Sequence, residues 1–143
     1  MTFDLKRFVD VQAGVYEDVL EELRQSRKVG HWIWFVFPQI AGLGRSSMSQ
    51  RYAIGSLEEA RAYLAHPILG ARIRECATLL LSAPPGRSAA DVLGDLDAMK
   101  VRSSMTLFHH ADGDDELFAR VLDRFYDGSG DPLTEQLIGP RDA

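Results

Sequence analysis

The amino-acid sequence predicts an all-α, single-domain protein, a compact bundle of about six to eight short helices. Apolar residues recur at helical spacing through most of the chain, and helix start and stop signals separate these stretches. No alternating series is long enough to form a sheet. With 143 residues, of which 45% are hydrophobic, the chain suits one domain over residues 1–143 with a short polar C-terminal tail.

Two helices are expected at the N-terminus. Asp4 can cap a short helix that runs through Gln12. After Gly14 a second helix should continue to about Gly30, because its apolar residues share one stripe. Those residues are Val15, Val19, Leu20 and Leu23.

An aromatic-rich stretch, residues 31–39, interrupts the helical pattern. Its β-branched and aromatic side chains would suit a buried strand, but the other segments offer it no partner strand. We therefore expect a buried extended or single-turn segment. Residues 41–44 form a glycine turn whose backbone can approach a ligand closely. A short helix around 50–53 follows, for which three serines offer an N-cap: Ser46, Ser47 and Ser49.

The middle of the chain carries a capping box and a long apolar stripe. Ser56 and Glu59 are spaced so that each side chain can bond the backbone amide of the other, which predicts a helix through Ala65. His66 and the proline after it begin the next helix. Its core stripe follows a helical repeat through Leu69, Ile73, Cys76 and Leu80.

The turn at residues 83–86, Ala-Pro-Pro-Gly, ends that helix. A second capping signal at 88–91 precedes a short turn. Asp95 or Asp97 can then begin a helix that reaches about Phe108.

The last two helices begin at acidic residues. Negative charge at residues 114–116 favours the positive end of a helix that contains Leu117, Phe118, Val121, Leu122 and Phe125. Asp131 and Pro132 open a final short helix, since proline is tolerated at the first helical position. That helix contains Leu133, Leu137 and Ile138.

Charge is distributed unevenly along the chain. The net charge is −5, yet residues 23–57 hold five basic side chains and no acidic one. This acid-free segment indicates that one face favours a small anion, whereas the acidic remainder argues against a nucleic acid polymer. A lone cysteine, Cys76, excludes an internal disulfide and suits the cytoplasm. We find no signal peptide or membrane span, and we expect a monomer.

The chain resembles the family numbered 1810 among the domains of unknown function. The stretches that carry the resemblance are Gly30–Gln39, Gly42–Gly44, Tyr52–Ile54, Leu57–Leu64, His66–Gly70, Asp97–Lys100 and Ser103–Phe108. The similarity extends from about Leu5 to Leu137. It implies a compact, mainly helical domain, found in bacteria and some eukaryotes, with no established activity. Some relatives carry the label calpastatin, but calpain-inhibitory regions are disordered and polar, unlike this chain.

Two groups of residues are candidates for a ligand site. Around the aromatic segment, aromatic faces lie next to polar edges and glycine backbone, which suits a stacked, phosphorylated ligand. This group contains His31, Trp32, Trp34, Gln39, Gly42, Gly44 and Ser46. The second group lies on one expected helix and contains Lys100, Ser103 and Ser104. Each group also has a structural interpretation: the aromatic residues as core, one serine bonded to a preceding carbonyl, and Lys100 paired with Asp97.

These groups predict a small anionic, nucleotide-like or phosphorylated ligand, bound beside the aromatic segment. If the ligand is turned over, hydrolysis is the least strained reaction, with His31 or a buried Glu75 as base and Ser104 as a further weak candidate. No metal set or cofactor motif is found. The alternatives are a protein- or peptide-binding module that uses the tryptophans, and an aromatic core with no ligand. The exposure of the two tryptophans distinguishes these three hypotheses.

Overall fold

The computed structural model describes residues 3–139, so the expected C-terminal tail lies mostly outside the described residues. Over that range ten helices and no strand are found, which confirms the all-α prediction. They are α1 (Lys6–Ala13), α2 (Tyr16–Arg24), α3 (Ile33–Val36), α4 (Ser47–Arg51), α5 (Leu57–Ala65), α6 (Leu69–Leu81), α7 (Ala89–Leu93), α8 (Asp95–Ala111), α9 (Leu117–Tyr126) and α10 (Pro132–Ile138). No helix within residues 3–139 is long and apolar enough to cross a membrane.

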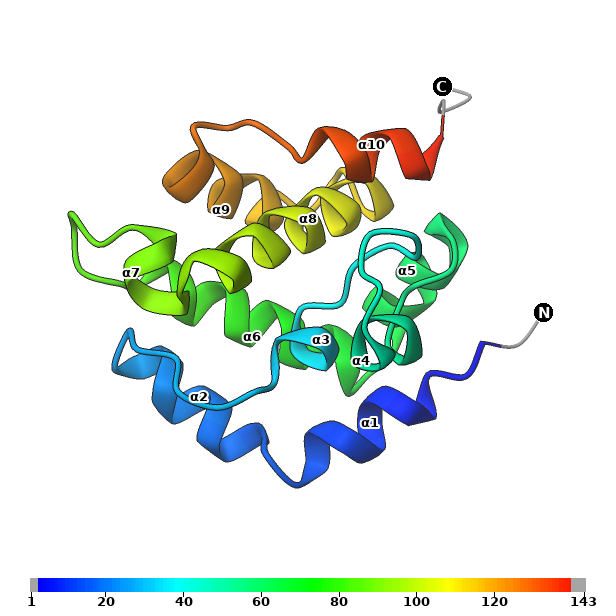
Figure 1. Ribbon diagram of the computed structural model, residues 1–143, viewed down its shortest axis with the longest axis horizontal. Coiled ribbons are helices and arrows are strands. Elements are labelled where there is room, and N and C mark those ends of the chain that lie inside the picture. The colour runs from blue at the N-terminus through cyan, green and yellow to red at the C-terminus, as the bar shows by residue number, and fades with distance from the viewer. Residues whose placement is uncertain (1–2, 140–143) are drawn as a thin grey trace.

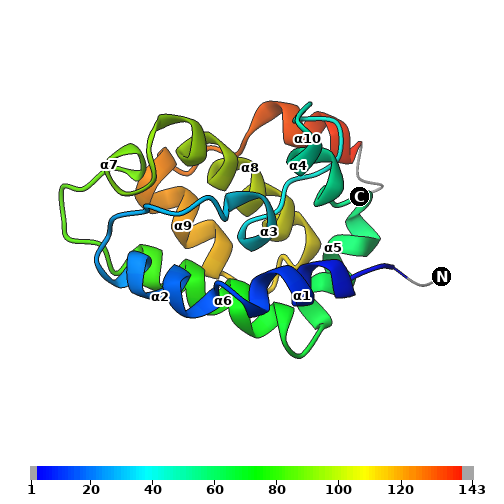
Figure 2. The ribbon, with the colours of Figure 1, turned by 60° about the horizontal axis from the view of Figure 1, so that its bottom comes forward.

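The longest helix, α8, organises the molecule. It packs against α5, α7, α9 and α10, while α6 packs against α2, α5 and α9. Figures 1 and 2 both place α1 and α2 along one side of the molecule and α10 on the other. The single turn α3 contacts α1, α6 and α8, so it lies between these layers. This position explains why the aromatic-rich segment is buried.

A chain of aromatic rings links the layers through the core. Phe8 of α1 meets Tyr63 of α5 at 5.1 Å between ring centroids, and Tyr63 meets Phe108 of α8 at 5.2 Å. Phe108 then meets Phe118 of α9 at 5.9 Å. All four side chains are fully buried, and ring separations of this size add to the free energy of hydrophobic burial.

Most predicted helix starts agree with the structure. The capping box at Ser88 and Asp91 forms in both directions, each bond being 3.0 Å long. Ser56 Oγ accepts from the amide of Glu59, but the Glu59 carboxylate accepts from the amide of Gly55 instead of completing the box. His66 confirms its predicted role, because its Nδ1 accepts from the amides at the start of the next helix.

Four expected helix boundaries were wrong by a few residues. Helix α2 ends at Arg24, short of the expected Gly30, because Ser26 adopts a positive φ of 54° that a helix does not allow. Helix α1 begins at Lys6, and Asp4 does not cap it, because Leu5 occupies the N-cap position without a side-chain bond. Helix α4 begins at Ser47 because Ser46 Oγ accepts from the amide of Ser49 at 3.1 Å. Helix α8 runs to Ala111, since nothing interrupts it before the turn that follows. The single turns α3 and α7 bring the helix count above the predicted six to eight.

Candidate functional site

A pocket of about 250 Å³ lies between the first half of α8, the start of α10 and the loop that follows α3. It brings together three stretches that are far apart in the sequence. Four of its lining residues are among the predicted ligand-binding residues: Gln39, Gly44, Lys100 and Ser103. The remaining lining residues are Leu43, Ser49, Leu96, Met99, Asp131 and Leu133.

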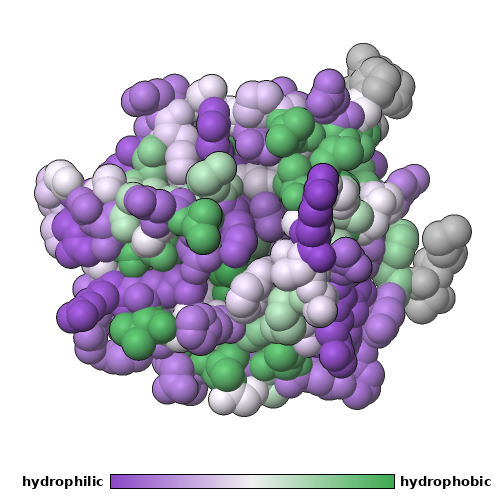
Figure 3. Space-filling view, viewed as in Figure 1, coloured by the Kyte–Doolittle hydropathy of each residue, from purple (hydrophilic) through white to green (hydrophobic). Residues whose placement is uncertain are grey.

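Helix α8 supplies one wall of this pocket from a single face. Its contributing residues, Leu96, Met99, Lys100 and Ser103, follow the spacing of neighbours on a helix surface. Leu96 and Met99 are exposed, and the exposed Leu133 of α10 lines the same pocket. In Figure 3 hydrophobic side chains gather over α10 and recur to its left over α8. The pocket is therefore apolar at its rim and polar where Lys100 and Ser103 line it.

The Lys100 ammonium carries the positive charge of the pocket. Its Nζ lies 3.4 Å from a carboxylate oxygen of Asp97 and 5.1 Å from the centre of the Trp34 ring. Asp97 also pairs with Lys28 at the shorter distance of 2.7 Å. The Lys28 side chain is only 7% exposed and donates to the carbonyl of Gly30 as well. Two ammonium groups thus share one carboxylate, which leaves the charge of Lys100 only partly neutralised.

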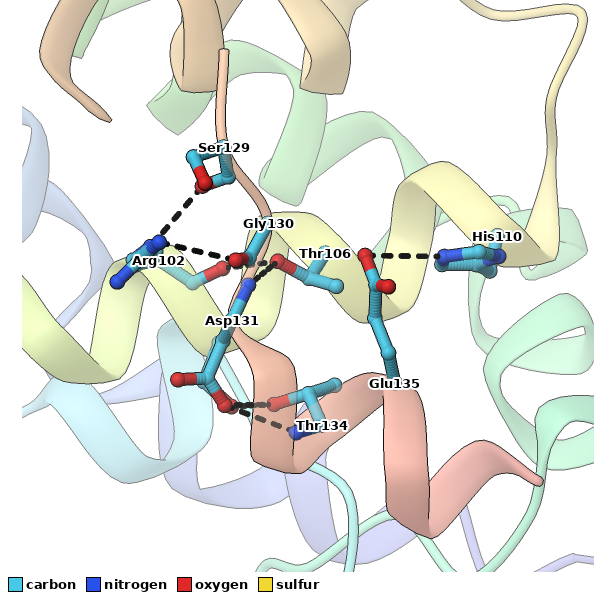
Figure 4. Close-up of polar contacts among 9 residues, drawn as sticks. Arg102, Thr106, His110, Ser129, Gly130, Asp131, Thr134 and Glu135 are labelled. Carbon is cyan, nitrogen blue, oxygen red and sulfur yellow. Dashed lines mark hydrogen bonds and ion pairs between the residues drawn. The ribbon is translucent and has the colours of Figure 1, made fainter. Parts of the chain in front are cut away.

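The acidic residue in the pocket, Asp131, is engaged by its own helix. One oxygen of its carboxylate accepts from the Thr134 amide at 2.9 Å and from the Thr134 hydroxyl at 2.6 Å (Figure 4). Thr134 in turn shares a 2.6 Å hydroxyl contact with Ser103, which ties α10 to α8. Thr106 Oγ1 accepts from the amide of Asp131 at 2.9 Å. The start of α10 is therefore fixed beside the pocket by polar bonds.

Local constraints of the loop explain the two predicted glycines. A smaller depression of about 140 Å³ shares Gln39, Gly44 and Ser49 with the pocket and adds Gly42. Gly42 has a positive φ of 105°, which favours glycine. A side chain at Gly44 would overlap Ser49. Both glycines are thus required by the loop itself, a structural reason that accounts for them without a ligand.

Five other predicted residues do not line the pocket. His31 is exposed and lines neither depression, and Ser46 serves as the N-cap of α4. Trp32 is only 2% exposed, and its Nε1 donates to Glu22 at 2.9 Å. Ser104 is fully buried, and its hydroxyl has no hydrogen-bond partner. Trp34 is half-buried beneath Lys100.

The candidates for catalysis do not form a catalytic group. Glu75 is exposed, contrary to the expectation of a buried base, because it lies on the outer face of α6. It accepts from the Tyr16 hydroxyl at 2.5 Å. Burial raises the pKa of Cys76 to about 12, so its thiol remains protonated and unreactive at neutral pH. Within residues 3–139 no group of three histidine, cysteine or acidic side chains could hold a metal ion.

The acid-free segment does not produce one basic face. Acidic residues outside the segment pair with two of its five basic side chains: Glu21 lies 3.7 Å from Arg24, and Asp97 pairs with the buried Lys28. Arg51 lines a different, polar depression of about 450 Å³ on the side of α1. That depression is larger, but Arg7 within it already donates to the carbonyls of Arg51 and Ala53. The pocket beside α8 is thus the better candidate.

Sequence reasoning missed the apolar rim of the pocket. Leu96, Met99 and Leu133 received no role, although Leu96 and Met99 share a helix face with the predicted Lys100. That spacing was a usable signal. The ion pair between Lys28 and Asp97 joins residues 69 positions apart, so no local sequence pattern indicates it.

Two comparisons with known proteins found similar chains. A family described as "Protein of unknown function (DUF1810)" matches residues 2–138. The crystal structure of the conserved hypothetical protein Rv1873 from Mycobacterium tuberculosis is similar with a TM-score of 0.94 and 50% sequence identity. The match covers 96% of this chain and 98% of that one. A search of the curated proteins found no match.

Proposed function

The chain belongs to the DUF1810 family of proteins of unknown function, and from the geometry of its pocket we propose that it binds a small ligand in which one anionic group stands beside an apolar group. One observation carries the proposal: the Lys100 ammonium lies among the exposed apolar side chains of Leu96, Met99 and Leu133. An ammonium placed there attracts a negative charge, while the rim gains free energy when apolar surface covers it.

The charge balance favours a ligand with a single negative charge. Lys100 is the one cationic side chain among the described lining residues, Asp97 lies 3.4 Å from its ammonium, and Asp131 adds a carboxylate to the same lining. A phosphate dianion would need further cations, which the pocket does not supply. Carboxylates with an apolar body are therefore the first ligands to test, and nucleotides and sugar phosphates the second.

The test is a titration of the ¹⁵N-labelled protein with N-acetylleucine and 4-phenylbutyrate, with nucleoside monophosphates and sugar phosphates as a second panel. We expect the carboxylates to shift the amide signals of Gly44, Lys100 and Ser103, with Kd values of about 1 mM. The corresponding neutral amides should bind several-fold more weakly, because they lack the charge that Lys100 recognises.

Replacing Lys100 tests whether binding depends on the pocket or only on the overall charge of the protein. Lys100→Met should weaken binding of the carboxylates about five- to tenfold. Lys6→Met is the matched control, because Lys6 also pairs with an aspartate on its own helix but lines a different depression. No signal shift at about 10 mM carboxylate or phosphate, or equal effects of the two variants, would rule the function out.

A further inference from the structure

Three charged side chains form a row beside the pocket, and we call them the charge triad: Lys28, Asp97 and Lys100. One carboxylate oxygen of Asp97 lies 2.7 Å from Lys28 Nζ, and the other lies 3.4 Å from Lys100 Nζ. The side chains are 26% exposed in Lys100, 17% in Asp97 and 7% in Lys28, and of the three only Lys100 lines the pocket. Water therefore screens the charge of Asp97 weakly, and this charge acts on any ligand that binds Lys100.

Lys28 fixes the position of the Asp97 carboxylate. The backbone amide of Lys28 donates to the carbonyl of Val92 at 2.8 Å, which attaches this loop to α7. The Lys28 ammonium donates to the carbonyl of Gly30 and lies 5.0 Å from the centre of the Trp32 ring. Because a buried ammonium needs a counter-charge, Lys28 holds Asp97 in place beside Lys100.

We propose that Asp97 is a specificity-determining residue, which shifts the preference of the pocket from doubly toward singly charged ligands. The inference rests on the proposed function, because it concerns the anionic group bound at Lys100. That group shares the Lys100 ammonium with the Asp97 carboxylate, so the two negative charges repel each other. Lys28 is a positioning residue, since it acts on the ligand through Asp97.

The repulsion by Asp97 grows in proportion to the charge of the ligand. Coulomb energy is proportional to each of the two charges, so Asp97 disfavours a dianion by twice the free energy that it costs a monoanion. A neutral ligand of the same shape is not repelled. A change in the shape of the pocket, by contrast, would affect ligands of every charge alike. The dependence on ligand charge therefore distinguishes an electrostatic role of Asp97 from a structural one.

Asp97 also has a structural role, which it shares with Asp95. Both carboxylates lie in the first turn of α8, where negative charge stabilises a helix. Asp95 is exposed, so water screens its charge. Asp95→Asn thus makes the same change of net charge in the same turn and is the matched control. The Asp131 carboxylate, which also lines the pocket, is present in every variant.

The experiment measures the Kd of three ligands that share one apolar body and differ in charge. They are 4-phenylbutyramide, 4-phenylbutyrate and 3-phenylpropyl phosphate, titrated at about pH 8, where a phosphate monoester carries about two negative charges. Asp97→Asn should tighten binding of the carboxylate about fivefold and of the phosphate about 25-fold, which is the square of the first factor. The Kd of the neutral amide should change by less than about twofold, and Asp95→Asn should change all three Kd values by less than about twofold.

Lys28→Met tests the positioning role, with the opposite sign. Without Lys28 the Asp97 carboxylate pairs with Lys100 alone, so the carboxylate ligand should bind about threefold more weakly and the phosphate about ninefold. Adding Asp97→Asn to this variant should restore carboxylate binding at least to the wild-type level. The double variant lacks the unpaired buried ammonium that Asp97→Asn alone leaves at Lys28, so it decides the question if the single variant does not fold. Thermal melts show which variants fold.

Two results would overturn the inference directly. One is an equal change of Kd for the neutral, singly charged and doubly charged ligands, and the other is an equal effect of Asp97→Asn and Asp95→Asn. If 4-phenylbutyrate binds the wild type and Asp97→Asn leaves its Kd unchanged, the proposed function stands and the inference fails. If 4-phenylbutyrate binds only after Asp97→Asn, the inference stands and the proposed function of the wild type fails. If no ligand binds any variant, both fail.

Discussion

At the scale of single residues, Glu22 determines how the aromatic segment is attached. Its Oε1 accepts from the amide of Val29 at 2.7 Å, from the amide of Gly30 at 2.9 Å and from Trp32 Nε1 at 2.9 Å. Burial alone would raise the pKa of this carboxyl, but the three hydrogen bonds outweigh it and lower the pKa below its usual range. One carboxylate thus joins α2 to the loop that leads into α3.

Glu22→Gln tests this attachment. Because the pKa of Glu22 is lower in the folded than in the unfolded state, its charge stabilises the fold above the unfolded-state pKa, and this stabilisation fades as the pH falls. We expect the variant to lose about 1–3 kcal/mol of unfolding free energy at pH 7. Between about pH 5 and pH 3 the wild type should lose more stability than the variant. Urea unfolding at pH 7 and pH 3 measures both, and parallel pH profiles would contradict the assignment.

At the scale of elements, α10 differs from the helices of the core. Its buried residue is Thr134, whereas α6 and α8 bury long apolar stripes. Its contacts with α8 include the hydroxyl pair of Thr134 and Ser103 and a contact of 3.7 Å between His110 and Glu135 (Figure 4), and Ile138 adds a partly buried apolar contact with the core. Few buried apolar contacts mean that α10 should open locally at a lower free energy than the core.

Thr134→Val tests the polar docking of α10. The variant keeps the shape of the side chain but loses its bonds to Ser103 and Asp131. We expect amide exchange in α10 to become about tenfold faster, which corresponds to about 1.4 kcal/mol. The melting temperature should change little, because the apolar core is untouched. Thr78→Val is the control, since its hydroxyl bonds only within α6. Unchanged exchange in α10 would show that other contacts hold the helix.

At the scale of the whole molecule, one core connects the N-terminal helices to α8 and α9. The aromatic chain from Phe8 to Phe118 crosses these layers, and α3 touches α1, α6 and α8 at once. Trp32 directly precedes α3 and Trp34 lies within it, so tryptophan fluorescence reports on the packing of α3. A single shared core predicts cooperative unfolding.

Unfolding in urea should therefore give the same midpoint by tryptophan fluorescence and by far-UV circular dichroism. Phe108→Leu should lower the unfolding free energy by about 1–3 kcal/mol and move both signals together, because Phe108 lies in the middle of the aromatic chain. If the fluorescence signal changed at a lower urea concentration than the circular dichroism signal, the N-terminal helices would form a separate unfolding unit.

Most of the fold could be predicted from the sequence because its signals are local. Ser88 and Ser56 each bond an amide three residues further along the chain. The apolar stripe through Cys76 repeats every three or four residues. The exact ends of α1 and α8 were not predictable, because packing and neighbouring turns decide them.

The sequence by itself determined the helical class, the order of the helices, the burial of the aromatic segment and four of the residues that line one pocket. Only the tertiary structure decided that Ser103 lines the pocket while Ser104 is buried, and that Leu133 closes the rim opposite Leu96. It also placed Asp97 against Lys28 and thereby neutralised one of the five basic side chains of that segment. The physical reason is range: helix signals act over a few residues, whereas pockets and charge balance depend on packing between distant segments.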